Sequence, residues 1–430
     1  MIDFTLSETQ KAAKRAAREF AHNELRPLVD ELDRLSDPWE CFVRTREVYR
    51  KAAKLGFTRG FLPTEYGGGG LGTLDYAITG EELTKVDVGV PSTILANLLA
   101  LAPIRFFGSE EQKRRWLTAY CAGQAADDGP HLASYAFSDA EGTANFDSPD
   151  PEAGLRTHAD LDGDSYVING RKYFSTNGSG WDRKGAWLYT VFCRTDLRKN
   201  ARESLSVLIV PGDTPGISVG RVEDKIGARL TVQPEVIFDH VRVPRENLIG
   251  REGDGLAIMY RAFNWRGALL GVGCVGLMQA AFEYCLDFAK RHRRGGSRPI
   301  IYHQNVGYML ANMKMRIEAA RSMVWRACHW VDTHEADGLE MPVLAKVFCS
   351  EIAVEVIRDA IYLLGVQGCT KDHPLERYLR DAIVLPVSDA SNMGIRRRQL
   401  HHLFLHPGYD ANAIVDDRLL PFDQQMAGEV

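Results

Sequence analysis

The sequence predicts an α+β protein in which a helical N-terminal domain, a small central β-barrel and a C-terminal four-helix bundle follow one another. Apolar residues recur at helical spacing over the first ~125 residues, and the period changes to two between about 126 and 245. Long helical patterns return from about 246 onward. We therefore predict three domains, with residues 1–125, 126–245 and 246–430.

The N-terminal domain begins with a predicted helix. Ser7 and Gln10 have the capping-box spacing, in which each side chain accepts a hydrogen bond from the other residue's backbone N–H. Apolar residues then follow at helical spacing up to Phe20. This segment is charged and lacks the apolar core of a signal peptide, so we expect a cytoplasmic protein. The longest apolar stretch, 90–104, is shorter than the ~20 residues of a membrane span.

Short apolar runs separated by turn residues predict the central β domain. The run 166–168 leads into Asn169-Gly170, a strong hairpin signal, so we expect a turn there. Further strands are expected at 205–210, 236–238 and 241–244. Short strands at this spacing favour a small barrel or sandwich over a parallel sheet.

The C-terminal domain contains three long amphipathic patterns, at 277–291, 306–331 and 342–364, and their short connections predict an antiparallel bundle. Residues 271–276 match the motif GxGxxG. This motif binds a dinucleotide only where a strand turns into a helix, and no strand pattern precedes it here. We therefore interpret its small residues as a helix surface that lets neighbouring helices approach closely.

Charge and cysteine content exclude several functions. The net charge is −5, with 57 acidic and 52 basic side chains, so no global basic field attracts nucleic acid or an anionic membrane. The eight cysteines are scattered without a CxxC pair, which argues for reduced, buried thiols rather than disulfides or a zinc site. We expect no metal, no nucleic acid and no membrane partner.

Several segments resemble the acyl-CoA dehydrogenase superfamily over essentially the whole chain. Residues 368–381 are closely similar to the family stretch GYxxDxPxERxxRD, and the segments 61–72, 81–83 and 108–117 also match. Within the superfamily, the chain is most similar to nitroalkane oxidases, on segments 142–145, 180–186, 294–297 and 392–399. The resemblance implies an FAD-dependent oxidoreductase with the α–β–α order predicted above.

The resemblance places the catalytic base at Asp389. Acyl-CoA dehydrogenases usually carry glutamate followed by Gly-Thr here, whereas nitroalkane oxidases also use aspartate. Both families begin by removing a proton from a carbon next to an electron-withdrawing group. The preceding apolar run 383–387 is compatible with a dry pocket, in which a carboxylate becomes a better base. Arg396 follows seven residues later, an offset typical of both families, and two helical turns would place it on the same face. The resemblance implies that Arg396 positions the carboxylate or the loop around it, whereas Arg397 and Arg398 are expected on a solvated face.

The resemblance also implies contacts with FAD in two regions. In the β domain, a hydroxyl near the flavin N5–O4 edge would stabilise the charge that accumulates on reduction. In the bundle, one segment resembles the part that reaches the FAD diphosphate of a neighbouring subunit, which implies a homodimer or homotetramer. The β-domain residues are Ser138, Thr143, Phe174 and Thr176; the bundle residues are Arg294 (or Arg293), Gln304, Gly365, Gln367 and Ser391.

Two classes of small-molecule substrate remain open. Acyl-CoA dehydrogenases carry an arginine near the position of Arg266, which would bind an anionic CoA thioester; a structural ion pair explains it equally well. Asp389 instead favours a nitroalkane, which would lose nitrite and yield an aldehyde or ketone with oxygen as electron acceptor. A thioester would give an enoyl product and pass electrons to an acceptor flavoprotein. Arg266 tips the prediction to the thioester. A non-catalytic scaffold that kept the fold is the third alternative, against which the base and the flavin-loop hydroxyls speak.

Overall fold

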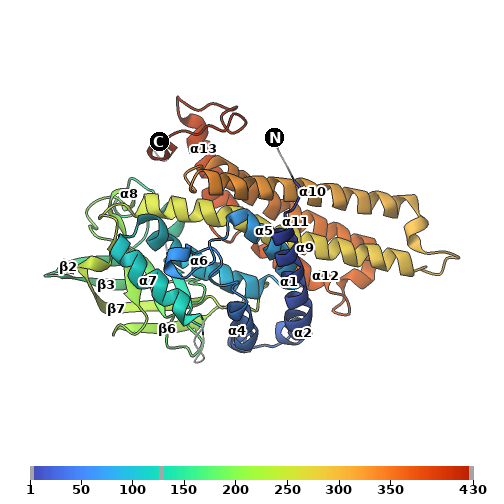
Figure 1. Cartoon of the computed structure of the whole chain (residues 1–430), viewed down its shortest axis with the longest axis horizontal. Helices are drawn as coiled ribbons and strands as arrows, with labels where there is room; N and C mark the ends of the chain where they lie inside the picture. The colour runs from blue at the N-terminus through green and yellow to red at the C-terminus, as the bar shows by residue number, and fades with distance from the viewer. Residues whose placement is uncertain (1–3, 125–129, 141, 426–430) are drawn as a thin grey trace.

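A computed structural model describes residues 4–124, 130–140 and 142–425, and it has the predicted α–β–α architecture (Figure 1). The strands gather at one end of the long axis, and the C-terminal helices extend along this axis to the other end. The predicted boundary between residues 125 and 126 lies outside the described residues. The N-terminal helices are α1 (Glu8–Phe20), α2 (Arg26–Asp33), α3 (Pro38–Val43), α4 (Arg46–Lys54), α5 (Thr73–Thr84), α6 (Gly89–Phe107) and α7 (Glu110–Gly123).

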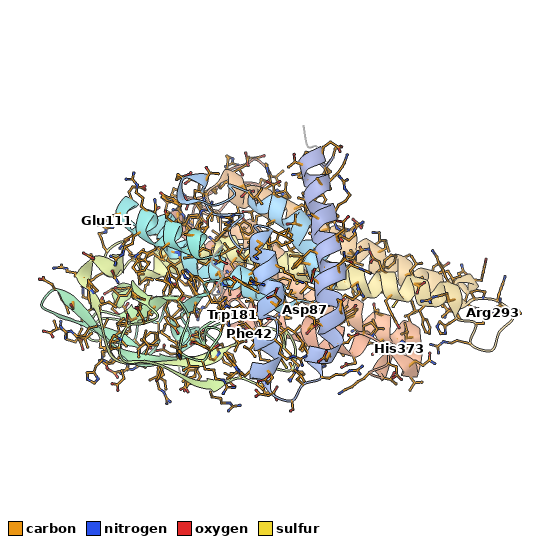
Figure 2. The ribbon with its side chains drawn as sticks, turned by 60° about the horizontal axis from the view of Figure 1, so that its bottom comes forward. Phe42, Asp87, Glu111, Trp181, Arg293 and His373 are labelled. Carbon is orange, nitrogen blue, oxygen red and sulfur yellow. The ribbon has the colours of Figure 1, made fainter. Side chains whose placement is uncertain are left out.

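The predicted capping box at the start of α1 is confirmed. Ser7 Oγ accepts a hydrogen bond from Gln10 N (3.1 Å), and Gln10 Oε1 accepts one from Ser7 N (3.0 Å). Other contacts join the N-terminal helices to the rest of the molecule. On α3, the ring of Phe42 stacks on that of Trp181 in the β domain, with ring centroids 4.7 Å apart (Figure 2). The N-terminal helices and the β domain are therefore packed together.

The apolar stretch 90–104 lies within α6, which is longer than the sequence pattern indicated. Of the described helices, α6 and α9 (Gly255–Arg291) are long and apolar enough to span a membrane. Most of these two apolar windows, 78% and 67% respectively, is buried inside the protein. Both helices contribute to one large core cluster.

The strands form a mixed eight-stranded sheet in the order β6-β7-β3-β2-β4-β5-β8, with β1 parallel to β4. The two halves of this sheet are joined where His158 on β2 pairs with Arg194 on β4. Apolar side chains from both halves share one core cluster, as expected for a small barrel or sandwich. The strand predicted at 205–210 is β5, whereas those predicted at 236–238 and 241–244 are one continuous strand, β7. The bounds are β1 (Ala133–Ala136), β2 (His158–Asp162), β3 (Ser165–Lys172), β4 (Leu188–Arg194), β5 (Leu205–Pro211), β6 (Ile217–Val222), β7 (Pro234–Pro244) and β8 (Leu248–Ile249).

The predicted hairpin turn at Asn169-Gly170 is wrong. Strands β2 and β3 pair up to Asp162 and Ser165, so the turn is Gly163-Asp164, and Asn169-Gly170 lies inside β3 at a bulge opposite β7. A Cβ at Gly170 would lie only 2.4 Å from the side chain of Thr157. The glycine therefore allows a close approach of two segments instead of forming a turn.

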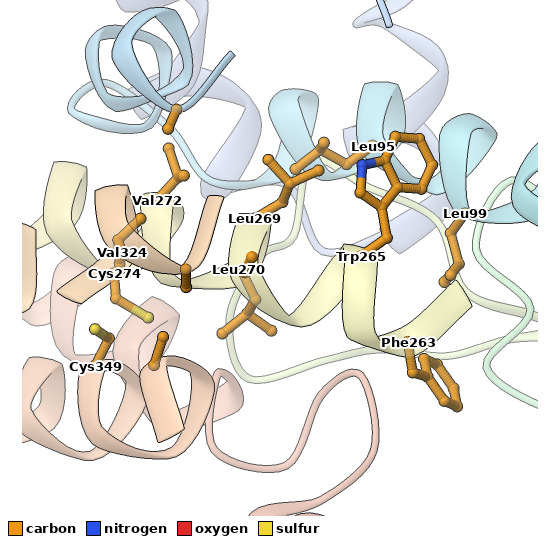
Figure 3. Close-up of a cluster of buried hydrophobic side chains, with 14 of the residues drawn as sticks. Leu95, Leu99, Phe263, Trp265, Leu269, Leu270, Val272, Cys274, Val324 and Cys349 are labelled. Carbon is orange, nitrogen blue, oxygen red and sulfur yellow. The ribbon is translucent and has the colours of Figure 1, made fainter. Parts of the chain in front are cut away.

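The C-terminal bundle is built from α9, α10 (Gln304–Thr333), α11 (Glu340–Leu364) and α12 (Leu375–Val384). The predicted helix 277–291 is only the second half of α9, which begins at Gly255. Figure 3 shows α9 in the core, where Leu269 and Trp265 face Leu95 and Leu99 of α6. The remaining short helices are α8 (Ala201–Ser204), α13 (Arg397–Leu405) and α14 (Phe422–Gln425).

Seven of the eight cysteines are buried free thiols, as predicted, whereas Cys369 is exposed. Burial raises the pKa of Cys274 and of Cys285 to about 12 in each case. Both thiols are therefore protonated at neutral pH, and protonated thiols are poor nucleophiles.

The GxGxxG motif lies in the middle of α9, so the interpretation as a packing surface is confirmed. A Cβ at Gly276 would come within 2.0 Å of Thr84 Oγ1, and one at Gly271 within 2.5 Å of Val324 Cγ2. At Gly273 the nearest such atom, Thr84 Cγ2, is 4.0 Å away. Two of the three glycines thus allow α5 and α10 to approach α9.

We expect Gly276→Ala to destabilise the protein by about 1–3 kcal/mol, because the added methyl group collides with α5. Gly273→Ala is the matched control in the same helix. Its methyl group has space, so the higher helix propensity of alanine should leave stability unchanged or raise it by up to ~1 kcal/mol. Urea unfolding measures both effects. Equal destabilisation by the two variants would contradict the packing role of Gly276.

Candidate active site

Asp389 lies in the loop between α12 and α13, not on a helix. Asp389 and Ala390 have φ values of 48° and 66°, in the left-handed region that L-residues seldom adopt. The prediction that Asp389 and Arg396 share a helix face is therefore wrong. The apolar run before the loop does not cover the carboxylate either, since Ile383 and Val387 are 47% and 66% exposed. Other elements must hold this loop in place.

Arg396 is fully buried and contacts the loop through its backbone. Its Nη2 donates hydrogen bonds to the carbonyl oxygens of Asp389 (3.2 Å) and Phe263 (3.1 Å), and Nη1 donates to Gln399 Oε1 (3.2 Å). Burial lowers the pKa of Arg396 to about 10, although nearby Asp389 opposes the shift. The guanidinium thus remains charged at neutral pH and joins the Asp389 loop to α9.

Arg266 lies on α9 and pairs with the Asp389 side chain. The distance from its Nη2 to Asp389 Oδ2 is 3.0 Å, and the whole residue is only 8% exposed. Its Nε and Nη1 have no hydrogen-bond partner. The structure therefore contains the ion pair that was the alternative explanation for this arginine.

Two buried tyrosine hydroxyls belong to the same surroundings and also lack hydrogen-bond partners, Tyr76 on α5 and Tyr135 on β1. Burial raises the pKa of both phenols. The charge of Arg266 opposes the shift at Tyr76, and that of Arg396 opposes it at Tyr135. Buried polar groups usually have partners, so unpartnered donors near Asp389 indicate a place where a ligand would supply acceptors.

In the β domain, a buried ion pair brings the predicted flavin-contacting segments together. Lys172 Nζ, at the end of β3, lies 2.6 Å from Asp139 Oδ1 and also donates to the carbonyl of Phe137 (2.9 Å). The backbone N–H of Tyr173 donates to the carbonyl of Ser138 (2.7 Å). The loop with Ser138 and Thr143 is thereby fixed against the segment with Phe174 and Thr176. Sequence reasoning missed this pair, although alternation along β3 places Lys172 at an inward position.

These segments offer a ring and hydroxyls that fit a flavin. Phe174 is 58% exposed and has a φ of 52°, an uncommon conformation for a bulky residue and one found at ligand-binding sites. Thr176 Oγ1 accepts a hydrogen bond from Gln233 Nε2 (3.2 Å), which leaves its proton available as a donor. Thr143 Oγ1 donates to the carbonyl of Asp139 (2.9 Å). An exposed aromatic ring and a hydroxyl donor two residues apart in the chain are what a flat, polar-edged cofactor needs.

Most of the predicted bundle contacts lie at the far tip of the molecule. Arg294 folds back to donate a hydrogen bond to the carbonyl of Leu364 and lies beside Gly365. Gln304 donates to the hydroxyl of Tyr308, and Gln367 is exposed in the turn after α11. Arg293, in the same loop as Arg294, is at the opposite end of the molecule from β3 and β7 (Figures 1 and 2).

Ser391, by contrast, lies next to Asp389, where its carbonyl accepts hydrogen bonds from the backbone of Ile395 and Arg396. The predicted FAD contacts therefore form two separated groups within one chain. This separation is compatible with the prediction that the tip contacts serve a neighbouring subunit, which stays a prediction.

Comparison with known proteins gives matches along the whole chain. Family models of acyl-CoA dehydrogenase match in order, the N-terminal domain at residues 7–124, the middle domain at 136–241 and the C-terminal domain at 253–392. The chain is 35% identical to the nitroalkane oxidase of Podospora anserina, over 95% of this chain and 97% of that protein. It is 31% identical to an acyl-CoA dehydrogenase of Bacillus subtilis, over 90% and 96% respectively.

Solved structures give the same result. A nitroalkane oxidase active-site mutant crystallized with 1-nitrooctane matches with a TM-score of 0.89 at 30% identity, covering 96% of this chain and 99% of its own. An aspartate and an arginine seven residues after it have roles in the reaction of flavoprotein nitroalkane oxidase, and Asp389 and Arg396 have the same separation. With three family models in order and similarity over nearly its full length, the chain belongs to the acyl-CoA dehydrogenase family.

Proposed function

We propose that this flavoenzyme oxidises a nitroalkane, with Asp389 as the base that removes the proton next to the nitro group. The protein belongs to a family of FAD-dependent oxidoreductases, and bound FAD would accept the two electrons of the substrate. The observation that carries the choice of substrate is the ion pair between the Asp389 side chain and buried Arg266, while Arg396 donates a hydrogen bond to the Asp389 carbonyl.

Proton transfer shifts the negative charge from Asp389 to the substrate, and Arg266 lies next to Asp389. The C–H bond of the substrate breaks, an O–H bond forms on Asp389, and the electron pair stays on the substrate. Asp389 then loses its attraction to Arg266, which at this distance amounts to several kcal/mol at the effective dielectric of a protein. A substrate anion within reach of the same guanidinium replaces that attraction, so Arg266 stabilises the charge before and after the transfer.

A nitro group suits this arrangement better than a thioester. It spreads the charge of its conjugate base over two oxygens, and Arg266 Nε and Nη1 with the hydroxyls of Tyr76 and Tyr135 are unpartnered donors in the same surroundings. A thioester enolate has one carbonyl oxygen for these donors. A role of Arg266 in binding CoA also requires access to phosphate, whereas this guanidinium is buried against Asp389.

The test is anaerobic mixing of the holoenzyme with primary nitroalkanes and, separately, with acyl-CoAs of several chain lengths. We expect loss of the oxidised-flavin absorbance with nitroalkanes only, and release of one nitrite per flavin reduced. On admission of oxygen, the oxidised spectrum should return without any acceptor flavoprotein. Flavin reduction by acyl-CoAs and not by nitroalkanes would refute the proposal in favour of thioester dehydrogenation.

A further inference from the structure

A fully buried lysine on α11 contacts both sides of the Asp389 loop. The Nζ of Lys346 donates hydrogen bonds to the carbonyl of Pro386 (3.2 Å), the carbonyl of Ala390 (3.1 Å) and Asn392 Oδ1 (2.5 Å). An ammonium group has three N–H donors and no acceptor, so these three oxygens satisfy it completely. Lys346 is 0% exposed, and within the described residues all of its side-chain hydrogen bonds go to the loop.

Asn392 extends this contact to a second point on α11. Its Nδ2 donates to Ser350 Oγ (3.0 Å) and to Glu351 Oε1 (3.1 Å), and its backbone N–H donates to the carbonyl of Pro386 (2.9 Å). Lys346 and Ser350 are four residues apart and so lie on one face of the helix. The two ends of the loop are thereby fastened to the same face of α11.

The loop needs such contacts because its backbone is strained. Left-handed conformations at non-glycine residues cost of order 1–3 kcal/mol each and persist only where surrounding contacts fix them. Asp389 and Ala390 are two such residues in succession. Arg396 holds the carbonyl of Asp389, and Lys346 holds that of Ala390, so the two cations fix adjacent peptide groups.

We infer that Lys346 is a positioning residue, which orients the Asp389 carboxylate toward the substrate by holding the loop 386–392. This inference rests on the proposed function, in which Asp389 is the base that deprotonates a nitroalkane. The described hydrogen bonds of Lys346 Nζ go to Pro386, Ala390 and Asn392 and not to the Asp389 carboxylate, so it acts through the loop and not by direct proton transfer.

The ionisation of Lys346 gives this role a pH signature. Burial, and next the charge of Arg396, lower the pKa of Lys346 to about 7, although Asp389, Cys274 and Glu351 oppose the shift. The ammonium form is thus complete below this pH and is lost above it. A neutral amine has two N–H donors for three acceptors, so one loop contact fails. We expect the rate of flavin reduction to fall as pH rises through about 7.

The experiment compares Lys346→Met with Lys314→Met in the holoenzyme. Lys314 pairs with Glu318 on an exposed face of α10, which makes it the control for removing a lysine charge. Rates of anaerobic flavin reduction are measured per bound FAD, first with the neutral nitroalkane and then with its preformed nitronate, which needs no base. A displacement of ~1 Å costs about 100-fold in rate, so we expect that loss for Lys346→Met with the neutral substrate. With the nitronate, the rate should stay within about twofold of wild type, and Lys314→Met should be unaffected with both.

Equal losses on both substrates, or no loss on either, would overturn the positioning role. Lys346→Gln, which remains a hydrogen-bond donor without charge, gives the same comparison if the methionine variant does not fold. Lys346→Met and Lys346→Gln should both lose the fall in the rate of flavin reduction above pH 7. The proposed function fails separately: if Asp389→Asn keeps its activity on the neutral substrate, Asp389 is not the base. If that variant is inactive while Lys346→Met is normal, only the inference about Lys346 fails.

Discussion

Asp389→Asn should slow the reduction of the flavin by a neutral substrate by about 10²- to 10⁴-fold, which is the range expected for the loss of a general base. Asparagine has nearly the same shape but its amide does not accept the proton, so the loop and the FAD should remain in place. The ion pair with Arg266 is lost at the same time. Stopped-flow reduction under anaerobic conditions gives the rate, and the visible spectrum gives the FAD content.

Asp417→Asn is the control for this substitution. Asp417 is also an aspartate in the left-handed region, with a φ of 56°, but its side chain is 81% exposed near the C-terminal end of the described chain. Its replacement should leave the rate unchanged. The preformed nitronate should still reduce the flavin of Asp389→Asn, because no proton has to be removed from it. A fully active Asp389→Asn enzyme would show that another group is the base.

The α–β–α order and the long bundle helices were predictable because they depend on local signals. The spacing of apolar residues identified α10 and α11 almost to the residue, and Ser7 with Gln10 marked the start of α1. Sequence reasoning failed where tertiary contacts decide. Asn169-Gly170 has strong turn propensity, yet it lies within β3, where Gly170 packs closely against Thr157, a residue well before it in the sequence.

The candidate site was predictable only where a motif identifies the residue. Asp389 and Arg396 were found through the resemblance, but their arrangement was not, because the left-handed backbone at Asp389 and Ala390 follows no sequence pattern. The role of Lys346 has a signal in the sequence, because it occupies an inward position of the apolar stripe on α11, three residues after Val343 and three before Cys349. A charged residue at such a position requires buried partners.

Arg396→Met should weaken both the fold and the reaction. Removing the guanidinium takes away its hydrogen bonds to the carbonyls of Phe263 and Asp389, and a hydrogen bond to a charged group typically contributes about 1.5–3 kcal/mol. Loss of the contact to Asp389 also frees the peptide group next to the one that Lys346 holds, so we expect flavin reduction to slow by about 100-fold. Urea unfolding of the holoenzyme and single-turnover reduction measure the two effects separately.

Arg397→Met tests whether the effect belongs to this position or to any arginine of the segment. Arg397 is the next residue, but its side chain is 44% exposed and pairs at the surface with Glu351. Exposed ion pairs contribute about 0–1 kcal/mol, so Arg397→Met should be nearly neutral in stability and rate. Arg396→Lys should fall between the two, because one ammonium group keeps the charge but does not reproduce the fixed fork that spans two carbonyls and Gln399. If Arg397→Met proves as damaging as Arg396→Met, a general basic field and not the buried fork would maintain the Asp389 loop.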